Sequence, residues 1–467
     1  MDRIPIKPDV TRIVLSITAL TILFGATTPA LSLEPDTDQI SISRAAYLDQ
    51  LEGFWLGQCI ANWTGLVTEM DKIGGDGAAG RFYTRDDWGG PDEPNIWSQE
   101  ISPLSSTIDW VYERPDGIWG ADDDTDIEYL YQHLLLTHQT SMLSSEQIRD
   151  GWLRHIYSDA DTPFRTGDGA PENYLWVSNQ RAFDLMSDEG LVPPATSDPE
   201  NNPHFEMIDA QLTTEIFGLF APARPDVALR MAHLPVRTTA RGEAALAAEF
   251  YIIMHSLASA VNAELTVKDQ VHWLASEARQ HLPELSYTAQ MYDFVKSRYD
   301  AGVPWEETRD AIHIRYQIQQ EDGYDITSRD LPCNGCFAAG INFAASIVSL
   351  LYGEGDFQET VKIAVLTGWD SDNPAATWGG LLGFMHGREA IEAQFGRRFS
   401  NRFNIHRTRR NFPAPGGVDT FDAMAENGAT IIDRVVTMEM SGSYSTRTGA
   451  WTVPLPSAAD YPCCRDD

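Results

Sequence analysis

The feature that most restricts the fold is a succession of segments with helical periodicity, together with a scarcity of strand-like alternation. Apolar residues recur at spacings of three and four over residues 45–67, 126–136, 144–158, 207–219, 225–234, 243–263, 267–281, 287–299, 338–351, 358–367 and 374–386. Only a short stretch near residues 446–453 alternates with a period of two. The pattern predicts an all-α fold. Because no change in composition divides the chain, we expect one domain over residues 43–440.

The first of these segments carries a ridge of small residues. Gly53, Gly57, Ala61 and Gly65 recur every four residues along residues 45–67. Residues four apart lie on the same face of a helix, so this ridge allows a neighbouring helix to approach closely. We therefore expect the first helix to be buried against another helix.

Composition excludes some classes of function. The 467 residues include 34 basic and 68 acidic side chains, for a formal net charge of −34, and 43% of the chain is hydrophobic. That apolar content is enough for a sizeable core and rules out wholesale disorder. A strongly acidic surface repels phosphate backbones, so we expect no nucleic-acid partner. Neither an HExxH motif nor a Cys/His zinc spacing occurs in the sequence.

The N-terminus has the organisation of a secretion signal. Three basic residues precede the uncharged stretch 13–33. Two small residues, Ala30 and Ser32, stand at the positions that a signal peptidase reads. The alternative is an uncleaved anchor, since about 20 apolar residues span a bilayer. Polar residues and Pro29 interrupt the run and favour cleavage. We predict a signal peptide over residues 1–32, a linker over 33–42, an exported (periplasmic or secreted) protein, and no stable membrane span after cleavage.

Five cysteines are present: Cys59, Cys333, Cys336, Cys463 and Cys464. A redox role for the Cys333–Cys336 pair would require a βαβ context, but helical patterns surround it. Buried free thiols or a structural disulfide bridge are the favoured interpretations. The C-terminal tail, residues 441–467, is assigned no role.

Four aspartates crowd the start of a predicted helix, within residues 122–126. One or two carboxylates can cap a helix N-terminus, but four exceed that need. Two carboxylates ~4 Å apart repel by about 4 kcal/mol at an effective dielectric constant of about 20, and a cation offsets this repulsion. The run is not an EF-hand, because Ile127 and His133 stand where glycine and glutamate are required. A metal site and a plain helix cap both remain open at this point.

A second acidic segment precedes another predicted helix. Asp370 and Asp372 lie two residues apart, and Asn373 followed by Pro374 has the form of a helix start. The two segments supply only oxygen donors, which suit Mg²⁺, Mn²⁺ or Ca²⁺. Glu69 directly follows the small-residue helix, and a plain surface glutamate at a helix end is the alternative for it.

These three segments, in this order and at these distances, resemble the ADP-ribosylglycohydrolase family. That family has a glycine-rich first helix ending in a glutamate, a Thr-Asp-Asp-Thr turn, and a late Gly-x-Asp-Thr-Asp-Thr loop that opens a helix. The resemblance covers about residues 51–387. It implies an orthogonal multi-helix bundle with a site for two Mg²⁺ ions, for which Mn²⁺ can substitute.

The resemblance also implies individual roles. Asp123, Asp124 and Thr125 match the early turn, and Asp370 and Asp372 match the late loop. Asp122 and Asn373 replace the two threonine ligands usual in the family, and both keep an oxygen donor. The implied metal ligands are therefore Asp122, Asp123, Asp124, Asp370, Asp372 and Asn373. Asn62 and Trp63 replace the Asp-Ala pair common in the first helix, which removes one charge near the site.

The implied reaction is hydrolysis at the anomeric carbon of a ribose, on a small-molecule or ADP-ribosylated substrate. Glu69 is the expected acid or base, with Asp123 or Asp122 as alternatives. The long irregular stretch 72–118 is rich in tryptophan, and we expect packed loops that rim a cleft. Two other classes remain open: an exported glycosidase acting on another carbohydrate or nucleoside, and a non-catalytic, metal-stabilised binding protein.

Overall fold

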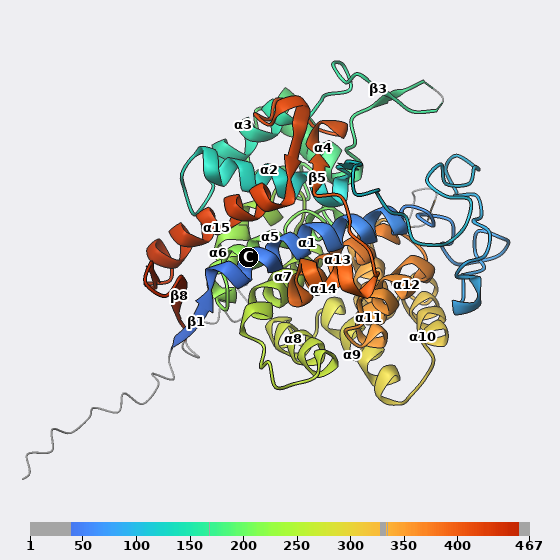
Figure 1. Ribbon diagram of the computed structural model, residues 1–467. Coiled ribbons are helices and arrows are strands. Elements are labelled where there is room, and N and C mark those ends of the chain that lie inside the picture. Colours follow the sequence, from blue (N-terminus) through green and yellow to red (C-terminus); the bar gives the residue numbers. More distant parts are fainter. Residues whose placement is uncertain (1–38, 168, 327–332, 334, 457–467) are drawn as a thin grey trace, which may run out of the picture. The chain divides into compact units, whose positions relative to one another are not determined.

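The computed structural model describes residues 39–167, 169–326, 333 and 335–456 (Figure 1). The predicted signal peptide and the cysteines of the C-terminal tail lie outside these residues. Fifteen α-helices occur in the described part of the chain. They are α1 (Arg44–Gly65), α2 (Asp123–Thr137), α3 (Ser145–His155), α4 (Val177–Asp188), α5 (Ile216–Phe220), α6 (Pro225–Val236), α7 (Gly242–Leu257), α8 (Val267–His281), α9 (Tyr287–Asp300), α10 (Trp305–Ile312), α11 (Ala339–Gly353), α12 (Phe357–Thr367), α13 (Asp372–His386), α14 (Arg388–Gln394) and α15 (Phe421–Met438). The predicted all-α fold class is confirmed.

The strands are short and lie at the edges of the helical assembly. Strand β2 (Trp119–Gly120) pairs in parallel with β5 (Arg402–Asn404), which pairs with β6 (Val418–Thr420), and β3 (Phe164–Arg165) pairs with β4 (Pro171–Glu172). The β2–β5 pair leads directly into the site described below, because Ala121 follows β2 and continues the pairing.

A third sheet joins two segments from opposite ends of the described chain. Strand β1 (Gln39–Ser43) pairs with β8 (Ala450–Pro454), which also pairs with β7 (Ser443–Ser445). The alternating stretch near residues 446–453 is thus part of a hairpin. Trp451 of β8 is fully buried and contacts the Tyr47 ring of α1 edge-on, with ring centroids 5.5 Å apart. Parts of the predicted linker and tail are therefore packed against the helices.

Helix α1 lies antiparallel to α13, and the small-residue ridge is their contact surface (Figure 1). A Cβ atom built on Gly57 would lie 2.2 Å from the carbonyl oxygen of Gly379, and one on Gly53 would lie 2.2 Å from that of Gly383. Real Cβ atoms do not come this close, so the two backbones can meet only because glycine stands at these positions. The prediction of a closely packed first helix is confirmed.

The single helix predicted over residues 207–219 is wrong. The structure has a 3₁₀ turn at Ile208–Ala210 and, after a break, the short helix α5. The amide of Ile208 donates to the carbonyl of Phe337, and Met207 forms a β-bridge with Ala338. The hydroxyl of Thr214 donates to the carbonyl of Ala210. The amide of Thr214, which a continuous helix would direct to that same carbonyl, donates instead to the carboxylate of Glu215 at 3.2 Å. Side-chain hydrogen bonds therefore replace the helical bond at this break, and the local pattern is overridden.

The expectation for the cysteines is met in the described residues. Cys333 and Cys336 form a disulfide, which is one of the two favoured interpretations, and Cys59 is a buried free thiol.

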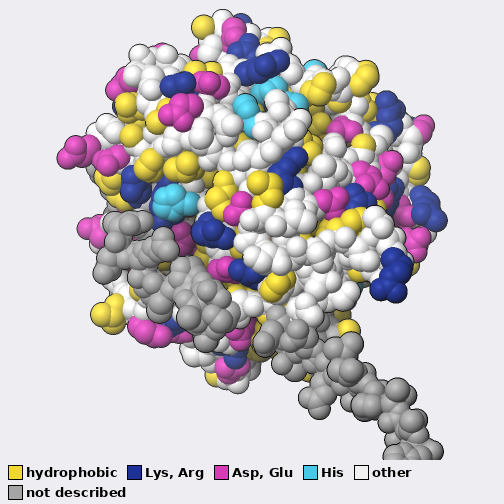
Figure 2. All heavy atoms as spheres, turned by 90° about the vertical axis from the view of Figure 1, so that its left-hand side faces the viewer, with side chains coloured by type: hydrophobic (Ala, Val, Ile, Leu, Met, Phe, Trp, Pro, Cys, Tyr) yellow, Lys and Arg dark blue, Asp and Glu magenta, His cyan; other side chains and the backbone are white. Residues whose placement is uncertain are grey.

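Acidic and basic side chains are interspersed over the face shown in Figure 2. No helix in the described residues combines the length and apolarity needed to cross a membrane.

Candidate metal centre and active site

The end of α1 and the start of α13 meet at backbone distance. A Cβ atom on Gly65 would lie 2.3 Å from the Cα atom of Asp372. The hydroxyl of Ser371, which precedes α13, donates to the carbonyl of Gly65 at 3.2 Å. Helix α13 starts at Asp372, two residues before the predicted first residue Pro374, so Asp372 is held on the helix rather than in a loop. The glycine at the end of α1 thus brings Asp372 into the site.

The loop before α13 places Asp370 beside Glu69. Gly368 has a φ of +100° and lies against Phe82 and the backbone of Lys72, so a larger residue there would be both strained and crowded. The amide of Met70 donates to the carbonyl of Trp369 at 2.9 Å, and the amide of Trp369 donates to the carbonyl of Lys72 at 2.7 Å. This pair of bonds locks the turn after α1 to the loop, and Glu69 lies in that turn.

The start of α2 is held by a small sheet. Strand β2 pairs with β5, and the amide of Ala121 continues the pairing by donating to the carbonyl of Asn404 at 3.1 Å. Asp122 then occupies the N-cap position of α2, and its amide donates to the hydroxyl of Thr125 at 3.0 Å. The helix-cap interpretation of this segment is therefore correct for one aspartate, and it leaves Asp123 and Asp124 unexplained.

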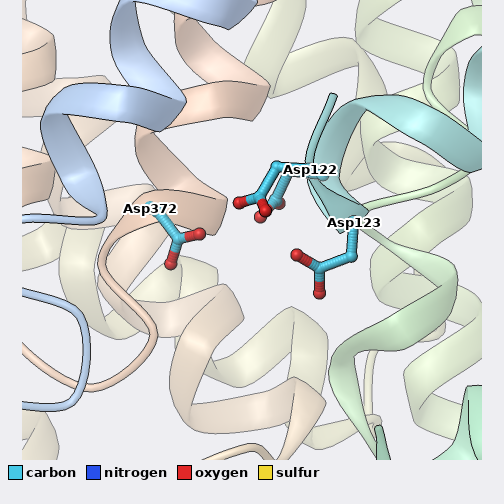
Figure 3. Close-up of side chains that lie close together, drawn as sticks. Asp122, Asp123 and Asp372 are labelled. Carbon is cyan, nitrogen blue, oxygen red and sulfur yellow. The ribbon is translucent and has the colours of Figure 1, made fainter. Parts of the chain in front are cut away.

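The two predicted acidic segments come together as two overlapping groups. Carboxylate oxygens of Asp122, Asp123, Asp124 and Asp372 lie within 4.8 Å of one another, and so do those of Glu69, Asp370 and Asp372. Asp372 belongs to both groups. Figure 3 shows the carboxylates of Asp122, Asp123 and Asp372 pointing toward the space between the starts of α2 and α13. Segments about 240 residues apart in the sequence thus share one site.

Burial and mutual repulsion raise the pKa values of these carboxyl groups. Burial raises the pKa of Glu69 well above its ordinary value, and the neighbouring Asp370 and Asp122 raise it further. Burial, followed by repulsion from Asp122 and Asp124, does the same for the pKa of Asp123. Burial also raises the pKa of Asp370 to about 6. Each shift means that ionising the group is unfavourable unless positive charge is added.

Two asparagines contact the carboxylates. The side-chain amide of Asn373 donates to Asp124 at 3.1 Å, and its carbonyl oxygen faces Gln211 at 3.5 Å. Asn373 is therefore a hydrogen-bond donor to one of the predicted ligands in this arrangement. Asn62 of α1 donates its amide nitrogen toward Asp122, Asp124 and Asp372.

The donor set fits a hard divalent cation. All the converging atoms are oxygens, which Mg²⁺, Mn²⁺ and Ca²⁺ prefer. Two buried oxygens at the site, Oδ1 of Asp372 and Oδ1 of Asn62, have no hydrogen-bond partner among the described residues. Buried acceptors of this kind need a proton or a cation to offset their loss of solvation.

Comparison with known proteins decides the family. Residues 43–424 match the pattern that defines the ADP-ribosylglycohydrolase family. The chain belongs to the ADP-ribosylglycohydrolase family. A solved structure described as an "ADP-ribosylglycohydrolase-related protein complex" is 16% identical to the chain, with a TM-score of 0.39, and the match covers 83% of this chain and 98% of that one. The search of curated proteins found no significant match.

Membership of the family makes this chain a hydrolase of glycosidic bonds by class. A cavity of about 400 Å³ lies beside the acidic groups and offers room for a sugar and part of its leaving group. Its acidic lining residues are Glu69, Asp123, Asp209, Asp370 and Asp372. Its aromatic lining residues are Trp97, Trp176 and Phe337.

The aromatic wall of the cavity comes from distant segments. Trp97 belongs to the long loop region 72–118, and its ring stacks on that of Phe337 with centroids 5.6 Å apart and planes inclined by 1°. Trp97 and Trp176 remain 48% and 42% exposed, so both rings keep surface that a ligand can contact. The expectation that the tryptophan-rich loops rim a cleft is met for Trp97.

Several site residues escaped the sequence analysis. Arg407 donates to Asp122 at 2.9 Å, and Arg409 forms a fully buried ion pair with Asp126 at 3.0 Å. Thr408, between the two arginines, also donates to Asp126. These residues follow β5, so the β2–β5 pairing carries them to the start of α2. The one local sign of their role in the sequence was the basic run Arg407-Thr408-Arg409-Arg410.

Asp209 is a second residue that sequence reasoning missed. It accepts hydrogen bonds from the Ser178 hydroxyl at 2.6 Å and the Asn179 amide at 2.9 Å. It therefore holds the start of α4, where Trp176 and Val177 line the cavity. Burial raises the pKa of Asp209 to about 6, and hydrogen bonds from Ser178 and Asn179 oppose the rise. No sequence motif surrounds it, because its role depends on a contact between elements 30 residues apart.

Proposed function

We propose that the protein is an exported, divalent-metal-dependent hydrolase that cleaves a glycosidic bond at a ribose. One observation carries the proposal: the two acidic groups share Asp372 and open into a cavity with an aromatic wall, and Glu69 belongs to both the second group and the cavity lining. Export is supported only by the N-terminal sequence, whose residues lie outside the described part of the chain.

The metal ligands proposed are Asp122, Asp123, Asp124, Asp370 and Asp372, with Asn373 as a neighbour that hydrogen-bonds Asp124. Two Mg²⁺ ions, or Mn²⁺ in their place, would supply positive charge and orient the hydroxyls of the sugar. The acidic side chains converge on one small volume, so these ions are also expected to add to folding stability.

Glu69 is the proposed acid–base residue. It lies in a turn fixed on both sides by backbone hydrogen bonds, and it faces the cavity rather than the bulk solvent. From there it can take a proton from the attacking water or give one to the leaving group of an oxocarbenium-like transition state. Trp97 and Trp176 present flat apolar faces to the same cavity, which suits a sugar face or a planar base.

The test is a substrate panel measured with Mg²⁺, with Mn²⁺ and with EDTA. ADP-ribosyl-arginine, ADP-ribosyl-serine and simple nucleosides represent the three classes of leaving group. Cleavage of an ADP-ribosylated compound that depends on metal supports the proposal. Cleavage of nucleosides alone would assign the chain to another class of ribosidase, and metal binding without turnover would make it a binding protein.

Variants show whether the activity belongs to this site. Asp123→Asn and Glu69→Gln should each abolish most of the turnover. The matched controls are Asp116→Asn and Glu264→Gln, because both side chains are exposed and lie away from the cavity lining. Equal loss in a control variant and its site variant would show that the activity comes from elsewhere.

A further inference from the structure

Asn62 occupies the centre of the first acidic group. Its side chain is fully buried on α1, one turn before the close contact at Gly65. Its amide nitrogen lies 3.4 Å from Oδ2 of each of three residues, Asp122, Asp124 and Asp372. Carboxylates from the starts of two other helices therefore surround a single amide group.

The amide nitrogen does not satisfy these three acceptors well. A side-chain amide has two hydrogens, so at least one of the three contacts lacks its own donor hydrogen. All three distances are longer than the usual range of about 2.7–3.2 Å for N–H···O bonds. The other end of the same group, Oδ1, is buried with no hydrogen-bond partner among the described residues. Such a buried acceptor costs about 1–3 kcal/mol.

A half-turn of the amide exchanges its two ends with almost no change in shape. Oδ1 would then face Asp122, Asp124 and Asp372 in place of the nitrogen. Three bare carboxylates would repel that oxygen. With a divalent cation among them, the same oxygen becomes a favourable neutral ligand, because side-chain carbonyls bind hard cations.

We propose that Asn62 is itself a ligand of the divalent cation held by Asp122, Asp124 and Asp372, and that it binds through Oδ1 after its amide turns over. The inference rests on the metal centre of the proposed function. It adds an uncharged ligand from α1, so that all three helices that meet at the site contribute to it. The orientation of the Asn62 amide is then coupled to whether the cation is bound.

The competing role for Asn62 has the opposite thermodynamic consequence. If Asn62 served only as a hydrogen-bond donor that reduces the electrostatic repulsion among the carboxylates, it would stabilise the metal-free state and oppose cation binding. Its removal would then tighten binding. If Oδ1 is a ligand, removal of the side-chain amide weakens binding. The sign of the change in affinity therefore distinguishes the two roles.

The experiment measures the Kd for Mn²⁺ by isothermal titration calorimetry on the metal-stripped, full mature chain. Asn62→Leu removes the amide at similar volume and should weaken binding by about tenfold or more. Asn62→Asp keeps an oxygen at the position and should bind at least as tightly as the wild type. In EDTA, Asn62→Asp should melt at a lower temperature than the wild type, because the added carboxylate is repelled by the other three when no metal is bound. The control is Gln132→Leu. It removes a buried side-chain amide of α2 that lies about two turns beyond Asp124, and it should leave the Kd for Mn²⁺ unchanged.

The outcomes separate this inference from the function on which it rests. Mn²⁺ binding by Asn62→Leu that equals or exceeds that of the wild type would overturn the ligand role and leave the metal centre intact. Should Asn62→Leu fail to fold, binding by Asn62→Asp that is tenfold weaker than that of the wild type would overturn it instead. Absence of Mn²⁺ binding by the wild-type protein would overturn the metal centre and the inference together.

Discussion

Substitution of Gly65 tests whether the close approach of α1 and α13 builds the site. In Gly65→Ala the new Cβ atom would lie 2.3 Å from the Cα atom of Asp372, and an ordinary contact requires at least 3.4 Å. The start of α13 must therefore move by about 1.1 Å. The obstacle is backbone, which cannot rotate aside, so the overpacking cost is at the upper end of its usual range, about 3 kcal/mol. The gain in helix propensity offsets about 0.5–1 kcal/mol of it.

The net loss of unfolding free energy is then about 2 kcal/mol. The functional loss should be larger in proportion, because Asp372 belongs to both acidic groups and a misplacement of about 1 Å at a reacting centre costs about a hundredfold in rate. The assays are denaturant unfolding and kcat/KM on the best substrate of the panel. Gly428→Ala is the control, since its nearest neighbours are side-chain atoms 3.3 Å away. Wild-type activity in Gly65→Ala would refute the argument that this contact positions Asp372.

Four further predictions follow from the same site and chain. Mg²⁺ or Mn²⁺ should raise the melting temperature and EDTA should lower it; Asp370→Asn should remove most of this response in a thermal-shift assay, and Asp116→Asn should not. Glu69→Gln should reduce kcat strongly while changing the metal-induced thermal shift less, because its proposed task is proton transfer; a full loss of the shift would instead make it a ligand. Burial lowers the pKa of His133 from 6.5 to about 4. The contribution of this side chain to stability is therefore present above pH 6.5 and is lost as the pH falls toward 4. In His133→Leu the unfolding free energy should fall by about 2 kcal/mol less over that interval, and an unchanged slope would contradict this. Intact-mass analysis of the exported protein should show a chain that begins near Leu33, whereas recovery of the full-length chain from the cytosol would exclude cleavage.

Local sequence determined the helices and the composition of the site. A helix depends on side chains three and four residues apart, so periodicity predicts it without knowledge of the rest of the chain. The ridge from Gly53 to Gly65 likewise predicted a close helix–helix contact, because the absence of side chains is a local property. The excess of carboxylates at residues 122–126 and at Asp370 and Asp372 indicated a cation site beside the helix-cap alternative, because the charge exceeds what a helix cap can use. The family resemblance then implied that the two segments share that site.

Only the tertiary structure decided which partners these elements take. The small-residue ridge predicts that some helix approaches α1. The structure identifies that helix as α13, whose Gly379 and Gly383 lie against the ridge. The contact of Arg409 with Asp126 and that of Asp209 with Ser178 and Asn179 join segments far apart in the sequence, and no spacing rule connects them.

The same reason accounts for the helix predicted over residues 207–219. Its local pattern was helical, but the amide of Thr214 donates to the side chain of Glu215 instead of the carbonyl of Ala210, and Ile208 is held by Phe337. Asn62 shows the limit most clearly. Its identity was visible from the start as a missing charge, whereas the three carboxylates around it and the unpaired oxygen beside them depend on where α2 and α13 begin in space. Short-range preferences are set by neighbours in the chain, and the chemistry of a buried site is set by neighbours in the fold.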